Sequence, residues 1–329
     1  MRVGSTRLTK PSPDHQPRLG ISQCLLGDSV RYDGGHKRDP FLTDVLTPLV
    51  EWIPICPEVE AGLGTPREAM RLVGDPQSPQ LVTIRTGIDH SKILQTFSQH
   101  RIGELQPLDL DGYVFKKNSP TCGMQHVKVY TNTGHPTLQG TGIFAAVCQK
   151  AFPLLPMEEE GRLNDPRIRD NFIERVFSYR RWKTLMQQKP LHFEKIIHFH
   201  ARHKYVLLTH SRTHYQDLDQ LIVFRGHCEP QDLGHRYGKL FMETLKVKAT
   251  VPKHVHVLRH LAGHLKKFLS AIERAELQES IQDYHQHLIP LIVPITLIKH
   301  HARMVNNPFL LDQVYLNPHP KELMLHNHV

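Results

Sequence analysis

The hydrophobic pattern of this chain changes once along its length, and the change limits the folds open to it. Before Pro153, short apolar runs alternate with segments that repeat apolar residues every three or four positions. After Pro166, the helical spacing continues almost throughout. Because 329 residues are also too many for one ordinary compact core, we expect two domains. The first is an α/β domain with a mostly parallel sheet flanked by helices, and the second is all-α.

We place the first domain at residues 18–155 and the second at residues 165–329, with residues 1–17 as a flexible extension. Buried strands are predicted at Arg18–Ser22, Glu51–Ile55 and residues 81–85 and 112–116. Helices between them are predicted at residues 41–50, 89–105 and 142–152. Helices of the second domain are predicted at residues 166–188, 191–210, 234–250, 253–276 and 279–298, the first capped by Asn164 or Asp165.

The cysteine content indicates a reducing compartment. Five cysteines are an odd number, and they lie too far apart for a disulfide framework, so we expect a cytoplasmic protein. The first residues lack the apolar run of a signal peptide, and the longest apolar stretch, residues 287–298, is too short to cross a bilayer. The chain has neither GxGxxG nor a Walker motif, so no nucleotide cofactor is expected.

Positive charge is concentrated in the second half of the chain. Lys and Arg exceed Asp and Glu by 2 in residues 1–150 and by 7 in residues 151–329, which also hold 19 of the 25 histidines. A basic surface of this kind favours an anionic macromolecule as partner.

Three cysteines stand at or just after the carboxyl ends of predicted strands: Cys24, Cys56 and Cys122. In an open α/β sheet these ends share one crevice, so residues far apart in sequence can converge there. Thiolates are the usual ligands of iron-sulfur clusters, and each cysteine stands near Gly or Pro, where the chain can turn closely. The alternative is that they are ordinary buried side chains, as we expect for Cys148 and Cys228.

The block after Cys24 contains Arg31, Tyr32 and Asp33. These side chains could bind a pyrimidine edge or a phosphate. They could equally form a surface turn, because YDGG is strong turn chemistry.

The blocks SQCLLGDSVRYDGG, CPEVEAGLGTPRE and KKNSPTCG resemble the signature blocks of the thiouracil desulfidase family, over roughly residues 19–151. The blocks FHARHKYVLLTHS, VPITLIKHHARM and LNPHPKEL resemble the YbgA-like domain that is fused to this family in many bacterial proteins. The resemblance implies that Cys24, Cys56 and Cys122 hold a 4Fe-4S cluster whose fourth iron binds the substrate sulfur. The reaction it implies is a hydrolytic desulfidation without electron transfer. Fusions of this kind are associated with 4-thiouridine in tRNA.

Hydrolysis needs a proton-transfer group, and Glu58, two residues after Cys56, is the first candidate. Its alternative role is to cap the following helix. Ser119 matches the family residue that orients substrate or water, and Thr121 could share that role. Gly62, Gly64, Pro66 and Arg67 are expected to shape the loop. 

Residues 253–274 predict an amphipathic helix with a basic ridge opposite its apolar face. The apolar face would contain Leu258, Leu261, Leu265, Phe268, Leu269 and Ile272. Candidate RNA-binding residues are Lys253, His256, His260, His264 and Lys267, together with His203 and Lys204 in the second histidine cluster. The ridge could track a phosphate backbone or be a solvated helix face, and the histidines could also pack between helices.

Three functions follow from these observations. The first is desulfidation of 4-thiouridine in tRNA, and the second is desulfidation of free thiouracil-type molecules. The third is a non-catalytic iron-sulfur RNA-binding sensor, which would need the cysteines but not Glu58.

Overall fold

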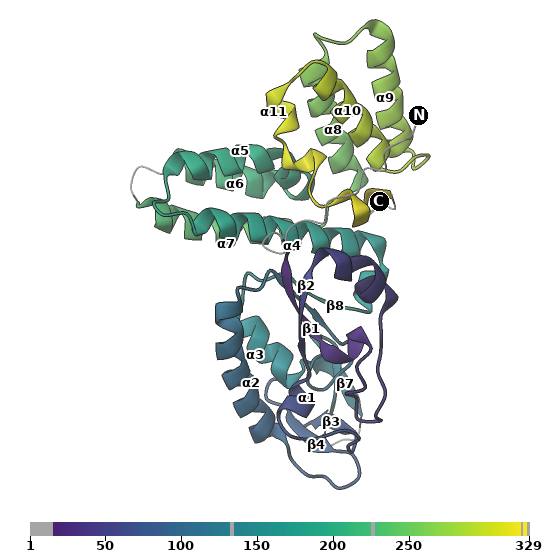
Figure 1. Cartoon of the computed structure of the whole chain (residues 1–329), viewed down its shortest axis with the longest axis vertical. Helices are drawn as coiled ribbons and strands as arrows, with labels where there is room; N and C mark the ends of the chain where they lie inside the picture. Colours follow the sequence, from purple (N-terminus) through teal and green to yellow (C-terminus); the bar gives the residue numbers. More distant parts are fainter. Residues whose placement is uncertain (1–15, 132–134, 225–227, 324, 328–329) are drawn as a thin grey trace, which may run out of the picture. The chain divides into compact units, whose positions relative to one another are not determined.

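The computed structural model describes residues 16–131, 135–224, 228–323 and 325–327, so the extension predicted at residues 1–17 lies almost entirely outside the described residues. The chain divides into two compact units, Met1–Gly161 and Arg162–Val329. The first combines strands and helices and the second is helical, in agreement with the predicted fold class (Figure 1). We describe each unit by itself.

A four-stranded parallel sheet forms the centre of the first unit. Its strand order is β2 (Glu51–Ile55), β1 (Arg18–Ser22), β5 (Gly112–Phe115) and β8 (Met157–Glu159). The inner strands β1 and β5 are the most buried, as their apolar runs predict. Gly20 is required in β1, because a Cβ there would lie 2.2 Å from the ring of Tyr113 on β5.

Two helices of the first unit, α2 (Ser91–Leu105) and α3 (Ile143–Ala151), lie side by side (Figure 1). The short α1 (Pro57–Glu60) follows β2. Residues 41–50, predicted as one helix, form a π-helical turn, Phe41–Leu46, and a 3-10 turn, Thr47–Leu49. Pro48 inside this segment lacks the N–H that a continuous α-helix would use.

A second sheet lies in the same unit and was not predicted. Its order is β4 (Gln80–Thr83), β3 (Met70–Val73), β6 (Val127–Tyr130) and β7 (Pro136–Gly140), with both outer strands antiparallel to their neighbours. The prediction that residues 81–85 form a strand of the main sheet is therefore wrong. This part of the chain contributes to β4, at the edge of the second sheet. Leu81 faces a separate small core with Leu72, Leu94 and Val129.

The second unit consists of helices joined by short turns. The helices are α4 (Pro166–Met186), α5 (Phe193–His210), α6 (Arg212–Val223), α7 (Pro230–Lys246), α8 (Val251–Leu265), α9 (Ala271–His285), α10 (Ile292–Met304) and α11 (Pro308–Leu311). Asp165 caps α4 as predicted, accepting hydrogen bonds from the backbone N–H groups of Arg167 and Ile168. Glycines in α7 allow a close approach to α4, because a Cβ at Gly238 would lie 2.1 Å from the Trp182 ring.

The helix predicted over residues 253–276 is wrong, because α8 ends at Leu265 and α9 begins after Ser270. Ser270 and Glu273 form a capping box: the Ser270 hydroxyl accepts from the N–H of Glu273, whose carboxylate accepts from the N–H of Ser270. The predicted apolar face fails beyond the break, since Phe268 is 60% exposed and Ile272 is 81% exposed. Residues 279–298 are likewise split, between α9 and α10.

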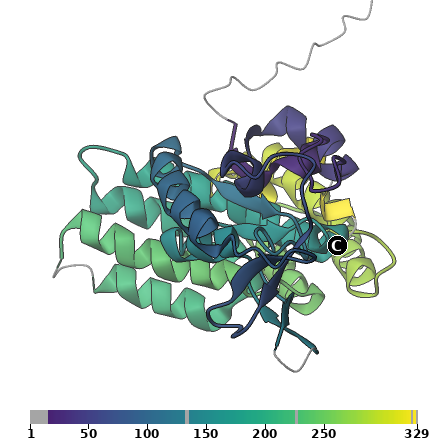
Figure 2. The same ribbon diagram turned by 90° about the horizontal axis from the view of Figure 1, so that it is seen from below.

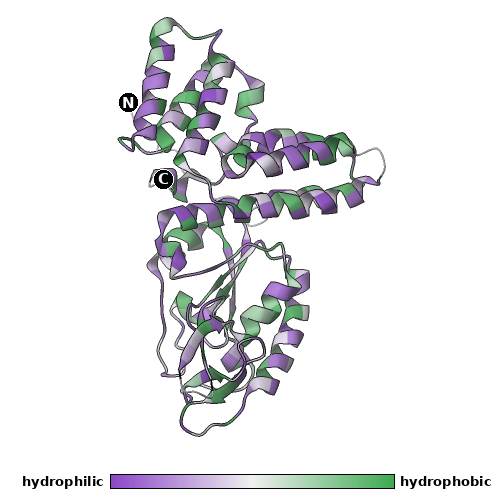
Figure 3. Ribbon diagram, turned by 180° about the vertical axis from the view of Figure 1, so that it is seen from behind, coloured by the Kyte–Doolittle hydropathy of each residue, from purple (hydrophilic) through white to green (hydrophobic). Residues whose placement is uncertain are grey.

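Both units lack a membrane-spanning candidate: none of the helices in the described ranges is long and apolar enough to cross a bilayer. Figures 2 and 3 show the same ribbon from below and, coloured by hydropathy, from behind; the helices of the second unit carry green and purple residues side by side, as amphipathic helices do.

The helical unit should lose stability as the pH falls. Burial lowers the pKa of His254 to about 4, from 6.5 for an exposed histidine. Between these values the unfolded chain binds a proton that the folded chain does not, so the free energy of unfolding decreases as the pH falls. We expect His254 to account for a loss of about 2 kcal/mol between pH 7 and pH 5.

Urea unfolding of the native protein and of His254→Gln at the two pH values measures this loss. The variant should show the smaller pH dependence, whereas His285→Gln, at an exposed position on α9, should behave as the native protein. Equal pH dependence in all three proteins would contradict the assignment.

Candidate functional site

The three strand-end cysteines line one cavity of about 420 Å³ in the first unit. Cys24 lies in a 3-10 turn, Gln23–Leu26, directly after β1. Cys56 follows β2 and begins helix α1. Cys122 lies in the loop after β5. The convergence expected from the parallel sheet is therefore present, because the carboxyl ends of β2, β1 and β5 meet at one edge.

Local hydrogen bonds hold the cysteine turns in position. The carbonyl of Cys24 accepts from the N–H of Lys37 at 2.8 Å, and the N–H of Cys122 donates to the Ser119 hydroxyl at 3.1 Å. A Cβ at Gly142 would lie 2.6 Å from the carbonyl oxygen of Thr121. Glycine at this position lets the start of α3 pack directly on the Cys122 loop.

All three thiols are buried at the edge of the cavity, and they lie within electrostatic reach of one another. Burial raises the pKa of Cys24 to about 11, with Lys116 opposing and Cys56 adding to the increase. Burial also raises the pKa of Cys56 and of Cys122. Without a bound cation these thiols stay protonated near neutral pH, so they suit a site whose metal displaces the protons.

The other two cysteines do not line this cavity. Cys148 lies in the core on α3, where burial raises its pKa to about 12. Cys228 precedes α7 in the other unit.

Glu58 extends into the cavity from α1 and is held from two sides. Its Oε1 accepts a hydrogen bond from the Thr121 hydroxyl at 2.6 Å, and its Oε2 is paired with the Arg67 guanidinium. The carboxylate is 14% exposed. It does not cap the helix, because Glu60 does so by accepting a hydrogen bond from the N–H of Cys56 at 2.9 Å.

Ser119 and Thr121 form a chain of hydroxyls that leads to Glu58. Their oxygens lie 3.0 Å apart, and the Ser119 oxygen also accepts from the N–H groups of Thr121 and Cys122. Thr121 is only 1% exposed, whereas Ser119 is half-buried at the cavity wall. Ser119 is therefore the more accessible of the two hydroxyls.

The block after Cys24 forms a turn and also lines the cavity. Arg31 and Tyr32 are lining residues, with the guanidinium 5.3 Å from the centre of the Tyr32 ring. Asp33 is not a lining residue; it pairs with Arg31 at 3.3 Å and accepts from the N–H of Gly35. The hydrogen bond from Arg31 lowers the pKa of Asp33. Arg31 and Tyr32 therefore lie at the cavity, whereas Asp33 belongs to the turn.

Sequence reasoning missed the charged residues around the pocket. Arg67, expected only to shape its loop, binds Glu58 and also donates to the carbonyls of Val30 and Gly64. Lys116 lines the cavity and pairs with Glu160. The sequence could have identified Lys116, because it directly follows β5 and so stands at a strand end as the cysteines do.

The predicted basic ridge on the helical unit is interrupted. His256, His260 and His264 are exposed on α8, but Lys267 lies in the turn beyond it, and the ammonium of Lys253 donates to the carbonyl of His210 at 2.6 Å. Burial and neighbouring cationic groups lower the pKa of His260, and burial and Lys204 lower that of His264, so neither contributes much charge near neutral pH.

The two candidates on α5 differ in position. His203 is buried, stacks on Phe199 with 4.0 Å between ring centres, and presents no surface to a nucleic acid. Lys204 is half-exposed, with its ammonium 5.7 Å from the centre of the Tyr205 ring.

Comparisons with known proteins match each unit to a different family. Residues 19–160 match the 2-thiouracil desulfurase family model, and residues 204–320 match a family described as a protein of unknown function, DUF1722. Two curated relatives are uncharacterized proteins. YbgA of Escherichia coli (strain K12) is 25% identical over 164 residues, 50% of this chain and 96% of YbgA. YbbK of Bacillus subtilis (strain 168) is 25% identical over 150 residues, 44% of this chain and 97% of YbbK.

Among solved structures, the chain is similar to the 4Fe-4S-dependent thiouracil desulfidase TudS, with 27% identity and a TM-score of 0.37, covering 46% of this chain and 95% of TudS. With the two family matches and the relatives, the chain joins a domain of the 2-thiouracil desulfurase family to a YbgA-like helical domain.

Proposed function

We propose that this protein is an enzyme that removes sulfur from a free thiouracil-type pyrimidine, using a 4Fe-4S cluster held by Cys24, Cys56 and Cys122. One observation carries the proposal: three thiols from three strand ends line the same cavity as a carboxylate fixed by Arg67 and Thr121. The cavity lies in the part of the chain that matches the 2-thiouracil desulfurase family.

The donor set of the cavity fits such a cluster. Its lining residues offer three thiols and no histidine, and Glu58, which lines it too, is already paired. Iron-sulfur clusters are held by cysteine thiolates, and three such ligands leave one iron open. When bound, the cluster would supply a Lewis-acidic iron that accepts the departing sulfur.

The overall reaction is hydrolysis. Water adds oxygen to the ring carbon that carried sulfur, and the products are the pyrimidine carbonyl and sulfide. Two protons must move from water, and no electron is gained or lost. This balance requires a proton acceptor beside the pyrimidine and requires no reductant.

Glu58 is the proposed proton acceptor. The Arg67 guanidinium pairs with one oxygen of the carboxylate and the Thr121 hydroxyl donates to the other, so the carboxylate has a defined orientation. A positioned carboxylate can take a proton from water and return it to the leaving sulfur or a ring nitrogen.

The remaining lining groups would hold the substrate. Ser119 is accessible from the cavity and its oxygen is aligned by two backbone N–H groups, so we assign it the contact with the pyrimidine or water. Thr121 then links Ser119 to Glu58. Arg31 and Tyr32 offer a cation and an aromatic ring at the wall, which suits a planar heterocycle with carbonyl oxygens.

Thiolated tRNA is a second candidate substrate, favoured by cations on the helical unit. A groove of about 350 Å³ there is lined by Arg180, Arg181, Lys195 and Arg202, among others. Arg202 is partly neutralised by Asp312 at 2.8 Å, so the groove offers fewer free charges than its composition indicates. The family match supports the free pyrimidine instead.

We propose a cytoplasmic location for this activity. Cys24, Cys56, Cys122 and Cys148 are free thiols, which is usual in a reducing compartment. A reducing compartment would also protect a cluster with an open iron from oxidation.

Replacing any one of the three cavity cysteines by alanine should abolish the cluster, because each removes one of three protein ligands. Iron content and visible absorbance after anaerobic reconstitution measure this loss. Cys148→Ala is the matched control and should keep the cluster, since Cys148 does not line the cavity. Loss of iron from Cys148→Ala alone would overturn the ligand assignment.

Glu58→Gln should retain the cluster but lower kcat by about 10²- to 10⁴-fold, the usual contribution of a general acid or base. Glu60→Gln is the control on the same helix, because Glu60 is not a lining residue and glutamine can still accept from the N–H of Cys56. A binding sensor without catalysis would show no sulfide release in the native protein, and both variants would then bind RNA alike.

The substrate is identified by sulfide release from 2-thiouracil, 4-thiouracil and tRNA containing 4-thiouridine, on anaerobically reconstituted full-length protein. We expect a higher kcat/KM for a free base than for the tRNA. The double variant Arg180→Ala/Lys195→Ala should leave kcat/KM for the free base unchanged. A preference for tRNA that this double variant removes, with turnover of the free base intact, would establish the tRNA as substrate instead.

A further inference from the structure

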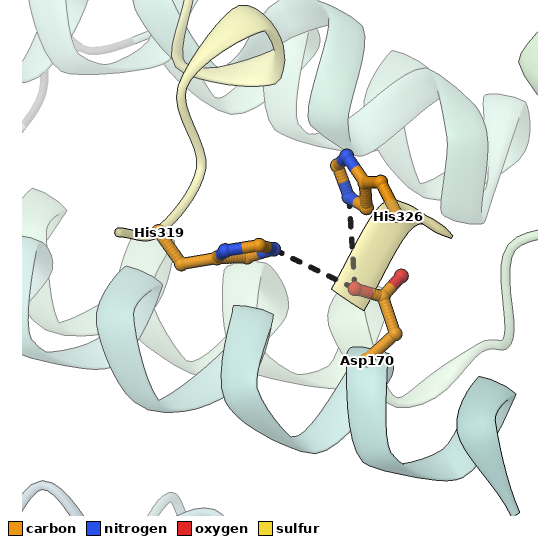
Figure 4. A group of neighbouring side chains, drawn as sticks. All are labelled: Asp170, His319 and His326. Carbon is orange, nitrogen blue, oxygen red and sulfur yellow. Dashed lines mark ion pairs between the residues drawn. The ribbon is translucent and has the colours of Figure 1, made fainter. Parts of the chain in front are cut away.

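The helical unit contains a buried cluster of one carboxylate and two imidazoles that the proposed desulfidase chemistry does not use. Asp170 lies in the second turn of α4, whereas His319 follows α11 along the chain and His326 lies in the 3-10 turn Leu325–Asn327. The Oδ1 of Asp170 lies 3.6 Å from the Nε2 of each histidine. Figure 4 shows both rings directed at the same carboxylate oxygen.

Both contacts are ion pairs, but they are too long to be hydrogen bonds, which place nitrogen and oxygen about 2.7–3.2 Å apart. The Oδ1 of Asp170 and the Nε2 of His319 are inaccessible to solvent and have no hydrogen-bond partner in the part of the chain that the structure describes. Burying a carboxylate oxygen that accepts no hydrogen bond is costly. The arrangement therefore calls for a group between the three side chains.

A metal ion satisfies all three atoms at once. The ligand atoms lie within 4.8 Å of one another. Zinc bonds of about 2.0–2.1 Å in a tetrahedron separate neighbouring ligand atoms by about 3.3 Å. An octahedral ion with bonds of about 2.1 Å would need about 3.0 Å. The observed 3.6 Å is closer to the tetrahedral value.

Hydrogen bonding of the histidine supports this use of its ring. The Nδ1 of His319 lies 3.2 Å from the carbonyl oxygen of Pro320. A carbonyl can only accept, so Nδ1 carries the proton and Nε2 presents a lone pair toward Asp170. The next carboxylate on α4, Glu174, is engaged elsewhere, with His210 at 2.9 Å.

A cavity adjoins the cluster on the side of its two histidines. His319 and His326 line a cavity of about 490 Å³ in the same unit, together with Lys299, His300 and Arg303. Three protein ligands beside an accessible cavity match zinc sites that keep a fourth position for water or substrate.

We propose that Asp170, His319 and His326 bind one zinc ion whose fourth ligand, water or an anion, enters from this cavity. The ion joins the C-terminal segment to α4 and neutralises a carboxylate inside the helical unit. Zinc removal should therefore lower the thermal stability of this unit, because the metal binds only the folded arrangement.

The test uses full-length protein in which Cys24, Cys56 and Cys122 are replaced by serine, so that no cavity thiol competes for zinc. After chelation, reloading with Zn²⁺ and dialysis, we expect about one zinc per chain and a higher Tm than the chelated protein. Adding Asp170→Asn or His326→Ala should remove both effects. The control His285→Ala changes an exposed histidine on α9 and should keep both.

Co²⁺ provides a second readout in the same background. It should give the visible bands of a tetrahedral nitrogen and oxygen site, without thiolate absorption, and these bands should be absent in His326→Ala. Should Asp170→Asn fail to fold by circular dichroism, His319→Gln replaces it. Failure of the triple-serine protein to retain zinc, or equal zinc content in the ligand variants, overturns the proposal. Neither result bears on desulfidation, which depends on the other unit's cysteines.

Discussion

Parallel pairing of β2, β1 and β5 is the constraint on which the candidate active site depends. In a parallel sheet all carboxyl ends meet at one edge. The strand directions alone therefore bring the three loops together, and no further contacts between distant residues are needed. The close pairing of β1 with β5, which Gly20 permits beside Tyr113, keeps two of those loops adjacent. A wider side chain at Gly20 would separate the strands that carry Cys24 and Cys122.

The polar contacts around Glu58 depend on this geometry in turn. Arg67 follows Glu58 in the connection between β2 and β3, whereas Thr121 lies in the loop after β5 and reaches Glu58 because the carboxyl ends of the strands share one edge. Arg67 also donates to the carbonyl of Val30, in the loop after β1. One carboxylate therefore ties together segments from all three cysteine-bearing loops, and its orientation is fixed before any substrate binds.

Sequence patterns were sufficient for features set by local periodicity or by strand direction. The runs at Arg18–Ser22 and Glu51–Ile55 are strands with the predicted bounds, and the cap at Asp165 is present. Periodicity failed where a local hydrogen bond competed with it, as at Ser270, whose capping box begins a new helix inside an apolar repeat. Sheet membership of β4 was also beyond reach, because a half-buried strand fits the edge of either sheet.

Histidine content was the least reliable guide, because its charge depends on burial that the sequence does not display. Several histidines counted as a reserve of positive charge lie inside the helical unit, namely His200, His203, His210, His254, His301 and His326. Burial lowers the pKa of His200, His203, His254 and His326, so these four add little positive charge near neutral pH.

Distances to the two carboxylates of α4, Asp170 and Glu174, distinguish two uses of histidine. His210 binds Glu174 at 2.9 Å and completes a closed polar pair. His319 and His326 stop 3.6 Å short of contact with Asp170. The two carboxylates lie one turn apart on the same helix, so poor packing of this core does not explain the longer distances at Asp170. They fit the proposed zinc ion between Asp170 and its two histidines.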